Sequence, residues 1–304
     1  GSVVHVQRHS RQAEFGKLVV CLDAALKIVH CSHKDADMVA NESAHLRALA
    51  ADVFLPPTLL WLVSSTPAAD SGYATLTLPL LTGPSLDEVL AQQREHKVPL
   101  FDTRPSLCRS IAVDVLDALN YLHDIHHVVH RDVKPGNLVF ASPHISSSTA
   151  LVLVDFGFAS DLSEPLKLYC GTRKFTAYEY EYKAGHDESV DVFAAGVTFF
   201  EMLEGYDAEP GYIKGKVEGR WSSHVRPHGN FIDVRLGGSN SSVWDREPTW
   251  RSMVRSMLTQ PARRWTAIEC IKHLQLCGEF RDVASVPRCW PWQDNHDTVQ
   301  RARG

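Results

Sequence analysis

The sequence lacks a run of apolar residues long enough to cross a membrane. Even the stretch VFAAGVTFF at 192–200 has only nine residues, whereas a membrane-spanning helix needs about 20. The beginning of the sequence also lacks a basic stretch followed by an apolar one, which is the pattern of a secretory signal. These absences predict that the protein has no membrane span and is intracellular, in the cytoplasm or the nucleus.

Paired cysteines and excess positive charge are missing as well. The seven cysteines are an odd number, spread from Cys21 to Cys289 without a C-x-x-C pair. This usage favours free thiols in a reducing compartment. The formal net charge of −5 argues against nucleic acid as the main partner.

What the sequence does have is 304 residues, 44% of them hydrophobic, which is enough for one large domain or for two lobes with cores of their own.

The first part of the chain has mostly strand patterns. Residues 15–29 predict two strands around a tight turn near Leu22 and Asp23, and residues 58–63 and 73–81 predict two more. Between them, residues 35–50 are rich in Ala, Leu and Glu and predict a helix.

After Thr82, Gly83 and Pro84 the patterns become helical. Helices are predicted at 85–97, in a longer segment opened by Thr103 and Pro105, and at about 188–204, 247–259 and 266–276. Residues 206–246 read mostly as loop. We therefore expect an α+β chain with a small β-rich lobe at 3–82 that contains one main helix, a larger mostly helical lobe at 83–282, and a C-terminal extension at 283–304.

Four histidines lie close together in YLHDIHHVVH at 121–130. Zinc needs ligands that converge on one point, but His126 and His127 are adjacent and tend to point apart. No cysteine or carboxylate completes a tetrahedral site. The first three histidines, His123, His126 and His127, are therefore predicted to cap or cover the end of a helix.

The fourth histidine, His130, begins the polar motif HRDVKPGN. The apolar LVF follows it, then a polar loop, the apolar ALVLV and DFG, so that two strands form a predicted hairpin. The start of the first strand meets the end of the second in a hairpin, and Asn137 and Asp155 should therefore lie close together. Amide and carboxylate oxygens suit Mg²⁺, which also binds phosphates. Asp132 is a carboxylate able to orient a hydroxyl.

These motifs, in this order, resemble those of eukaryotic protein kinases of the Ser/Thr type. The resemblance covers roughly residues 11–280 and implies a bilobal protein-kinase-like fold. It implies an enzyme that transfers the γ-phosphate of ATP, with Mg²⁺, to a serine or threonine of a protein substrate, and it leaves room for a regulatory protein partner. In such an enzyme Asp132 is the catalytic base, Lys134 contacts the γ-phosphate, and Asn137 and Asp155 hold Mg²⁺.

The resemblance also assigns residues to the nucleotide. Lys27 of AALK would contact the α- and β-phosphates, and Glu42 would fix it. The other residues implied at the nucleotide are Gly16 of the glycine-rich loop, Leu18, Ala25 and Leu138 around the adenine, Leu78 as gatekeeper, and Pro79, Leu80 and Leu81 as the hinge.

The stretch CGTRKFTAYE at 170–179 resembles the end of an activation segment. Thr172 would then support Asp132 and Lys134. The resemblance further implies that Glu179 pairs with Arg264, and that Asp191 of DVFAAG holds the backbone of the catalytic loop.

The glycine-rich loop departs from the family pattern. RQAEFGKL at 11–18 retains only Gly16, with Arg11 and Ala13 in place of the first two glycines. Since glycines let the backbone approach phosphates, nucleotide binding is expected to be weakened or the loop to be mobile, unless the loop lies elsewhere. A pseudokinase that acts as a scaffold is therefore the second hypothesis. A small-molecule kinase of related fold is the third, and CGT…AYE argues against it.

Overall fold

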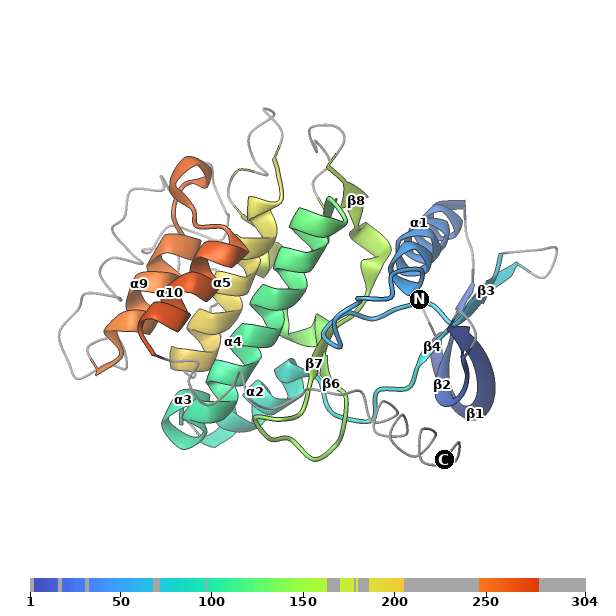
Figure 1. The fold of residues 1–304 in the computed structure, drawn as a ribbon, viewed down its shortest axis with the longest axis horizontal. Coiled ribbons are helices and arrows are strands. Elements are labelled where there is room, and N and C mark those ends of the chain that lie inside the picture. The colour runs from blue at the N-terminus through green and yellow to red at the C-terminus, as the bar shows by residue number, and fades with distance from the viewer. Residues whose placement is uncertain are drawn as a thin grey trace, which may run out of the picture.

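The computed structural model describes residues 3–15, 18–30, 33–67, 72–96, 98–162, 170–177, 179, 186–204 and 246–278. These residues form two unequal lobes (Figure 1). The smaller lobe contains a sheet and one long helix, and the larger lobe is mostly helical. The predicted loop at 206–246 falls almost wholly outside the described residues, and so does the extension at 283–304. Within the described ranges no helix combines the length and apolar character that a bilayer crossing requires.

The smaller lobe has one antiparallel four-stranded sheet and the helix α1 (His33–Ala50). The strands are β1 (Val3–Phe15), β2 (Leu18–His30), β3 (Ser64–Thr66) and β4 (Tyr73–Pro79), in the spatial order β1-β2-β4-β3. The predicted turn near Leu22 and Asp23 is wrong, because β2 continues through both residues and pairs with β1 from Leu18 to Ile28. This stretch contains neither Gly nor Pro, and a single Asp does not break a strand whose neighbours all pair.

The strand predicted at 58–63 is also wrong, because this segment lies between the lobes and forms backbone hydrogen bonds with both. The backbone N–H of Leu60 donates to the carbonyl of Leu153, and that of Leu62 donates to the carbonyl of Leu46. These two bonds tie the segment to the hairpin of one lobe and to α1 of the other. The apolar run is buried for this reason, and only residues 64–66 after it form a strand.

The larger lobe contains the helices predicted from the sequence, within a few residues at each end. They are α2 (Leu86–His96), α4 (Pro105–Asn120), α5 (Ser189–Glu204), α9 (Pro248–Met257) and α10 (Ala267–Leu276), with a short α3 (Leu100–Thr103) before α4. Short 3₁₀ or π turns occur at Tyr121–Ile125, Pro135–Asn137, Phe156–Phe158, Arg173–Phe175 and Pro261–Arg263. Short strands are β5 (Val128–Val129), β6 (Leu138–Phe140), β7 (Leu151–Leu153) and β8 (Ser160–Asp161).

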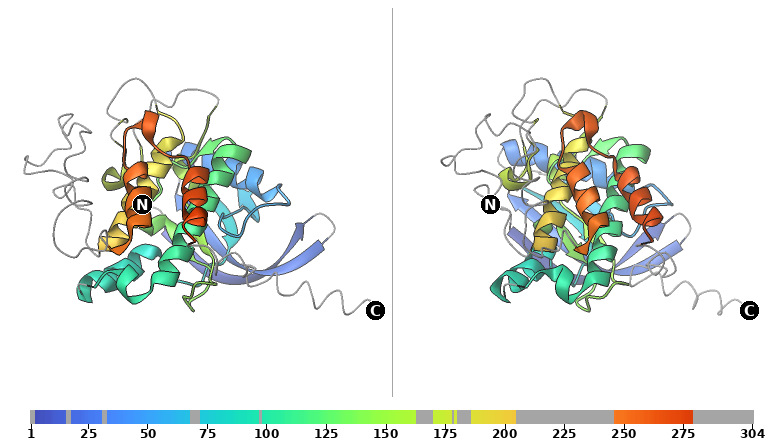
Figure 2. Two further views of the ribbon diagram at one scale, coloured as in Figure 1. Left: turned by 60° about the vertical axis from the view of Figure 1, so that its left-hand side comes forward. Right: turned by 90° about the vertical axis from the view of Figure 1, so that its left-hand side faces the viewer.

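The helix α5 forms the centre of this lobe, and all its residues from Val190 to Leu203 are buried. Figure 2 shows α9 and α10 lying against α5 and α4. The approach of α9 to α5 depends on Gly196, because a Cβ there would lie 2.8 Å from the Cβ of Met257. Trp250 of α9 is fully buried, and its ring forms T-shaped contacts with Phe101 and Phe199. This packing gives the lobe a rigid base on which the site residues are mounted.

The histidines of the 121–130 stretch face different partners. His123 is buried and its Nε2 lies 3.0 Å from Asp191, whereas His126 lies 3.1 Å from Asp52 in the connection after α1. His126 and His127 lie at the helix end: the backbone N–H of His126 donates to the carbonyl of Tyr121 at 3.3 Å, and His127 Nδ1 lies 3.2 Å from the carbonyl of His123. The prediction that all three cap or cover the helix is thus wrong for His123, which is part of the core because a buried carboxylate lies beside it.

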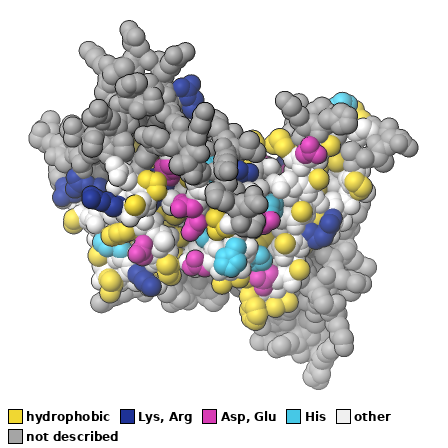
Figure 3. All heavy atoms as spheres, turned by 90° about the horizontal axis from the view of Figure 1, so that it is seen from above, with side chains coloured by type: hydrophobic (Ala, Val, Ile, Leu, Met, Phe, Trp, Pro, Cys, Tyr) yellow, Lys and Arg dark blue, Asp and Glu magenta, His cyan; other side chains and the backbone are white. Residues whose placement is uncertain are grey.

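Charges of both signs are mixed on one face of the described residues. On the face drawn in Figure 3, basic and acidic side chains are interspersed over both lobes. This distribution agrees with the modest net charge of −5.

Candidate active site

Asp191, near the start of α5, binds the backbone of the predicted catalytic loop at His130 and Arg131. One carboxylate oxygen of Asp191 accepts the backbone N–H of His130, the other accepts that of Arg131, both at 2.7 Å. Burial alone would raise the pKa of Asp191, but the hydrogen bond from His123 and the backbone N–H groups outweigh it and hold this pKa below its ordinary value. Arg131 adopts a left-handed conformation with φ of 66°, so the loop needs this anchor.

We expect Asp191→Asn to destabilise the protein by about 2–4 kcal/mol at neutral pH, since the amide can accept only one of the two backbone bonds. The pKa of Asp191 is lower in the folded chain than its ordinary 3.8, so its stabilisation is present above that value and disappears as pH falls through the folded pKa. The difference in urea midpoint between wild type and variant should therefore shrink between about pH 5 and pH 2. Asp37→Asn, at an exposed position of α1, is the control, and a difference that stays constant with pH would contradict this role.

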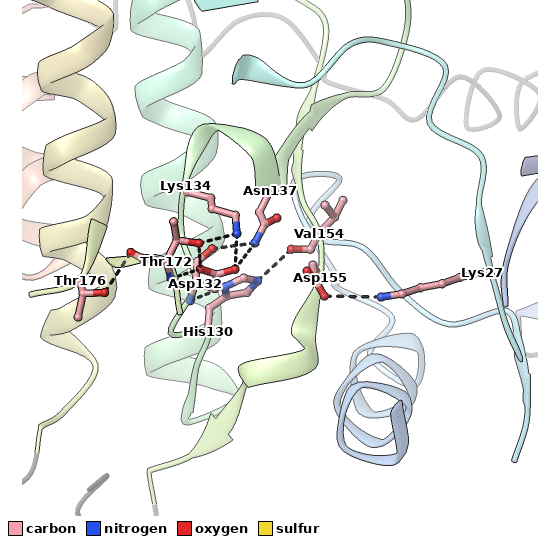
Figure 4. Close-up of polar contacts among 9 residues, drawn as sticks. All are labelled: Lys27, His130, Asp132, Lys134, Asn137, Val154, Asp155, Thr172 and Thr176. Carbon is pink, nitrogen blue, oxygen red and sulfur yellow. Dashed lines mark hydrogen bonds and ion pairs between the residues drawn. The ribbon is translucent and has the colours of Figure 1, made fainter. Parts of the chain in front are cut away.

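Asp132 lies in the centre of a hydrogen-bond network (Figure 4). Its Oδ1 accepts the backbone N–H and the hydroxyl of Thr172, both at 2.8 Å. Its Oδ2 accepts Lys134 Nζ at 2.7 Å and Asn137 Nδ2 at 3.0 Å. The structure therefore brings together Asp132, Lys134, Asn137 and Thr172, as predicted from the sequence.

Gly171 makes the approach of Thr172 possible. Its φ is 85°, and a Cβ at this position would lie 2.3 Å from the carbonyl oxygen of Arg131. Only glycine combines this left-handed conformation with such a short distance to the neighbouring backbone. The G of the motif CGT is thus explained by contact between the activation segment and the catalytic loop.

The hairpin between HRDVKPGN and DFG is confirmed. Strands β6 and β7 are antiparallel, with Leu138 opposite Leu153, and Val154 N–H donates to the carbonyl of Asn137 at 2.9 Å. Asp155 follows directly and has a left-handed φ of 68°, which is uncommon for a residue other than glycine and often marks a functional position. Its carboxylate lies 3.6 Å from Lys27 Nζ.

The side chains of Asn137 and Asp155 fit a magnesium ion. The amide nitrogen of Asn137 donates to the backbone carbonyl of Asp132 at 2.8 Å and to its carboxylate, so the amide oxygen faces away from Asp132 (Figure 4). The carboxylate of Asp155 is 45% exposed. An amide oxygen and an accessible carboxylate are hard oxygen donors, which Mg²⁺ prefers.

Lys27 of β2 and Glu42 of α1 form an ion pair between the sheet and the helix. Lys27 Nζ lies 2.9 Å and 2.8 Å from the two carboxylate oxygens, and Glu42 is buried. Burial would lower the pKa of Lys27, but the Glu42 and Asp155 carboxylates raise it above its ordinary value. Lys27 therefore remains charged and points toward Asp155 (Figure 4).

The residues predicted around the adenine lie where the two lobes connect. Ala25 of β2 pairs in register with Leu78 of β4, and Leu78 is buried. Leu138, the first residue of β6, is fully buried, while Leu80 and Leu81 are half-buried after β4. Of the remaining three residues, Pro79 is the buried last residue of β4, Gly16 lies outside the described residues, and Leu18 is described only as the first residue of β2, opposite Phe15.

The structure adds two residues of α1 that were not predicted from the sequence. Asn41 Nδ2 donates to the carbonyls of Ala159 at 2.8 Å and Gly157 at 3.4 Å. His45, one turn further along the helix, also lies by the carbonyl of Ala159, and burial lowers its pKa. Both residues attach α1 to the segment after Asp155. The i, i+4 spacing is the only signal in the sequence, and it is common in every helix.

The comparisons with known proteins agree with this geometry. Residues 22–275 match the family model described as a protein kinase domain. The chain is 37% identical to cAMP-dependent protein kinase catalytic subunit 3 of Drosophila melanogaster over 125 residues, covering 38% of this chain and 20% of that protein. It is 30% identical to calcium/calmodulin-dependent protein kinase type II alpha chain of the same organism over 224 residues, covering 71% of this chain and 38% of that protein.

A third relative is calcium/calmodulin-dependent protein kinase cmkA of Emericella nidulans, with 33% identity over 176 residues, or 54% of this chain and 38% of that protein. The chain thus spans less than two fifths of the length of these three relatives. The predicted bilobal α+β kinase fold and the resemblance to eukaryotic protein kinases are confirmed. Because the family match extends over most of the sequence and includes every residue of the Asp132 network, the chain belongs to the protein kinase family.

Proposed function

We propose that the protein is an ATP- and Mg²⁺-dependent kinase that phosphorylates serine or threonine in a protein substrate. One observation carries this proposal: the Lys27–Glu42 ion pair is formed, and Lys27 faces the Asp132 network across Asp155 and Asn137 (Figure 4). A cation for the phosphates and a carboxylate for the acceptor are thus present together. A protein that served only as a scaffold would need neither.

Asn137 and Asp155 would hold Mg²⁺, which neutralises the charge of the transferring phosphate when it is bound. Lys27 would bind the α- and β-phosphates, and its contact with Glu42 keeps the ammonium group from moving away. The polar groups are already fixed by the fold, so little reorganisation is needed when the nucleotide binds.

The role of Asp132 follows from its hydrogen bonds. Both oxygens of a carboxylate together accept about four bonds, and four are already present, from Thr172, Lys134 and Asn137. When Lys134 turns to the γ-phosphate, a position on Oδ2 becomes free for the acceptor hydroxyl. The hydroxyl oxygen then forms a bond to the γ-phosphorus, the bond to the bridging oxygen breaks, ADP leaves, and Asp132 takes up the hydroxyl proton.

The experiment that tests this function is phosphate transfer from ATP, with Mg²⁺, to a degenerate library of Ser, Thr and Tyr peptides. We expect phosphoserine and phosphothreonine, and loss of transfer when Mg²⁺ is chelated. Nucleotide binding is followed in parallel by the thermal shift of the protein with ATP. Binding without transfer to any peptide would instead support the scaffold, and phosphotyrosine as the main product would contradict the assigned acceptor.

A further inference from the structure

The segment next to Asp132 contains two adjacent cations in different surroundings. Lys174 forms an ion pair with Glu201 of α5, whose side chain is only 1% exposed, and its ammonium lies 5.2 Å from the ring centre of Phe175. Arg173 is exposed, and no carboxylate in the described part of the chain forms an ion pair with it. One of the two cations is therefore directed into the protein and the other toward solvent.

The Lys174–Glu201 pair decides what Glu201 can bind. A carboxylate that is almost completely buried needs a partner, because leaving it unpaired in the interior is strongly unfavourable. Lys174 supplies this partner from within the chain. Glu201 is consequently not available to a basic side chain of a peptide that approaches Asp132.

Four further carboxylates, two near the catalytic loop and two on α2, have partners within the chain. Glu179 pairs with Arg264, and Asp191 accepts the backbone N–H groups of His130 and Arg131. On α2, Asp87 lies 3.0 Å from Arg94, and Glu88 accepts both the N–H and the hydroxyl of Ser85. A basic peptide would have to break one of these contacts to pair with any of these four carboxylates.

We propose that the substrate segment carries acidic residues next to its serine or threonine, and that Arg173 selects them. This inference rests on the proposed function. Thr172 is bonded to Asp132 through its backbone N–H and its hydroxyl, and the Cα of Arg173 follows that of Thr172 at about 3.8 Å. Since an extended peptide advances about 3.3 Å per residue, a side chain one or two positions from the acceptor comes within reach of Arg173. The guanidinium group binds a carboxylate through two parallel hydrogen bonds.

The test uses three matched serine peptides, with two glutamates, two glutamines or two arginines on each side of the acceptor. We expect kcat/KM for the glutamate peptide to exceed that for the glutamine peptide by about two- to fivefold, and the arginine peptide to be the poorest. The preference should decrease as salt is raised from about 0.05 M to 0.5 M, because the contact is exposed.

Two variants connect the preference to Arg173. Arg173→Ala should bring the glutamate peptide to the level of the glutamine peptide, and Arg173→Glu should reverse the order. Arg263→Ala removes an equally exposed arginine from the turn before α10 and should leave the preference unchanged. Unchanged thermal unfolding of each variant shows that its fold is intact.

Binding separates this inference from the proposed function. The same peptides, with alanine in place of the acceptor serine and a fluorescent label, are titrated with the protein and followed by anisotropy. If no peptide is phosphorylated but the glutamate peptide binds best and Arg173→Ala abolishes this, the proposed function fails and the charge selection stands. If the arginine peptide binds or reacts as well as the glutamate peptide, the selection by Arg173 is wrong, whether or not phosphate is transferred.

Discussion

Asp132→Asn is expected to lower kcat by about 10²–10⁴-fold, the usual contribution of a general base. The amide cannot take up the acceptor proton. Its NH₂ group would also face the donor groups of Lys134 and Asn137, or the N–H of Thr172, all of which now point to the carboxylate. ATP binding should change by less than about threefold, because Lys27 and Asp155 lie on the other side of the site and keep their contacts.

Single-turnover phosphate transfer and an ATP titration measure the two effects separately. Asp124→Asn is the matched control, since Asp124 is exposed in the turn after α4, and it should retain wild-type activity. Equal rates of transfer for Asp132→Asn and wild type would show that Asp132 is not the base. Loss of ATP binding together with transfer would instead show that the substitution disturbs the whole site.

The second large effect is expected on stability, at the ion pair between Glu179 and Arg264. The guanidinium group binds Glu179 through both terminal nitrogens, donates to the carbonyls of Thr259 and Ser189, and has no exposed surface. Arg264→Leu leaves the Glu179 carboxylate buried without its cation. Loss of one partner of such a pair typically costs about 3–5 kcal/mol, and we expect this decrease in the free energy of unfolding.

Urea denaturation at neutral pH measures this decrease. The double variant Arg264→Leu with Glu179→Leu should recover a large part of the lost stability, because no unpaired charge remains. Arg263→Ala, at the exposed neighbouring position, should change stability by less than about 0.5 kcal/mol. A double variant no more stable than Arg264→Leu would mean that the lost hydrogen bonds of Arg264, and not the isolated carboxylate, account for the effect.

The candidate site residues that the structure brings together are mostly close to one another along the chain. Asp132, Lys134 and Asn137 lie within six residues of one another, and one hairpin brings Asp155 to them. The hairpin follows from two short apolar runs around a polar loop, and its register follows from the pairing of Leu138 with Leu153. Such features depend on nearest neighbours along the chain, so the pattern of residues is sufficient.

The predictions that were wrong concern segments whose backbone partners are remote. The run at 58–63 has the composition of a strand, but its backbone N–H groups donate in turn to Leu153 of β7, Leu46 of α1 and Thr77 of β4, so it does not pair along one neighbouring strand. His123 has the appearance of a residue at the end of a helix, but Asp191 lies beside it from 68 residues away. Composition alone does not identify such a partner.

The sequence by itself determined the family, the helices of the larger lobe, and the chemical groups that can bind phosphate, metal and a hydroxyl. Only the tertiary structure decided that α1 places Glu42 against Lys27, that Asn41 holds Ala159 across 118 positions of the chain, and that Lys174 turns inward to Glu201 while Arg173 faces solvent. The physical reason is that these contacts join elements from distant parts of the chain. Their geometry is set by the packing of the lobes and by the burial of charge, which no local spacing of residues specifies.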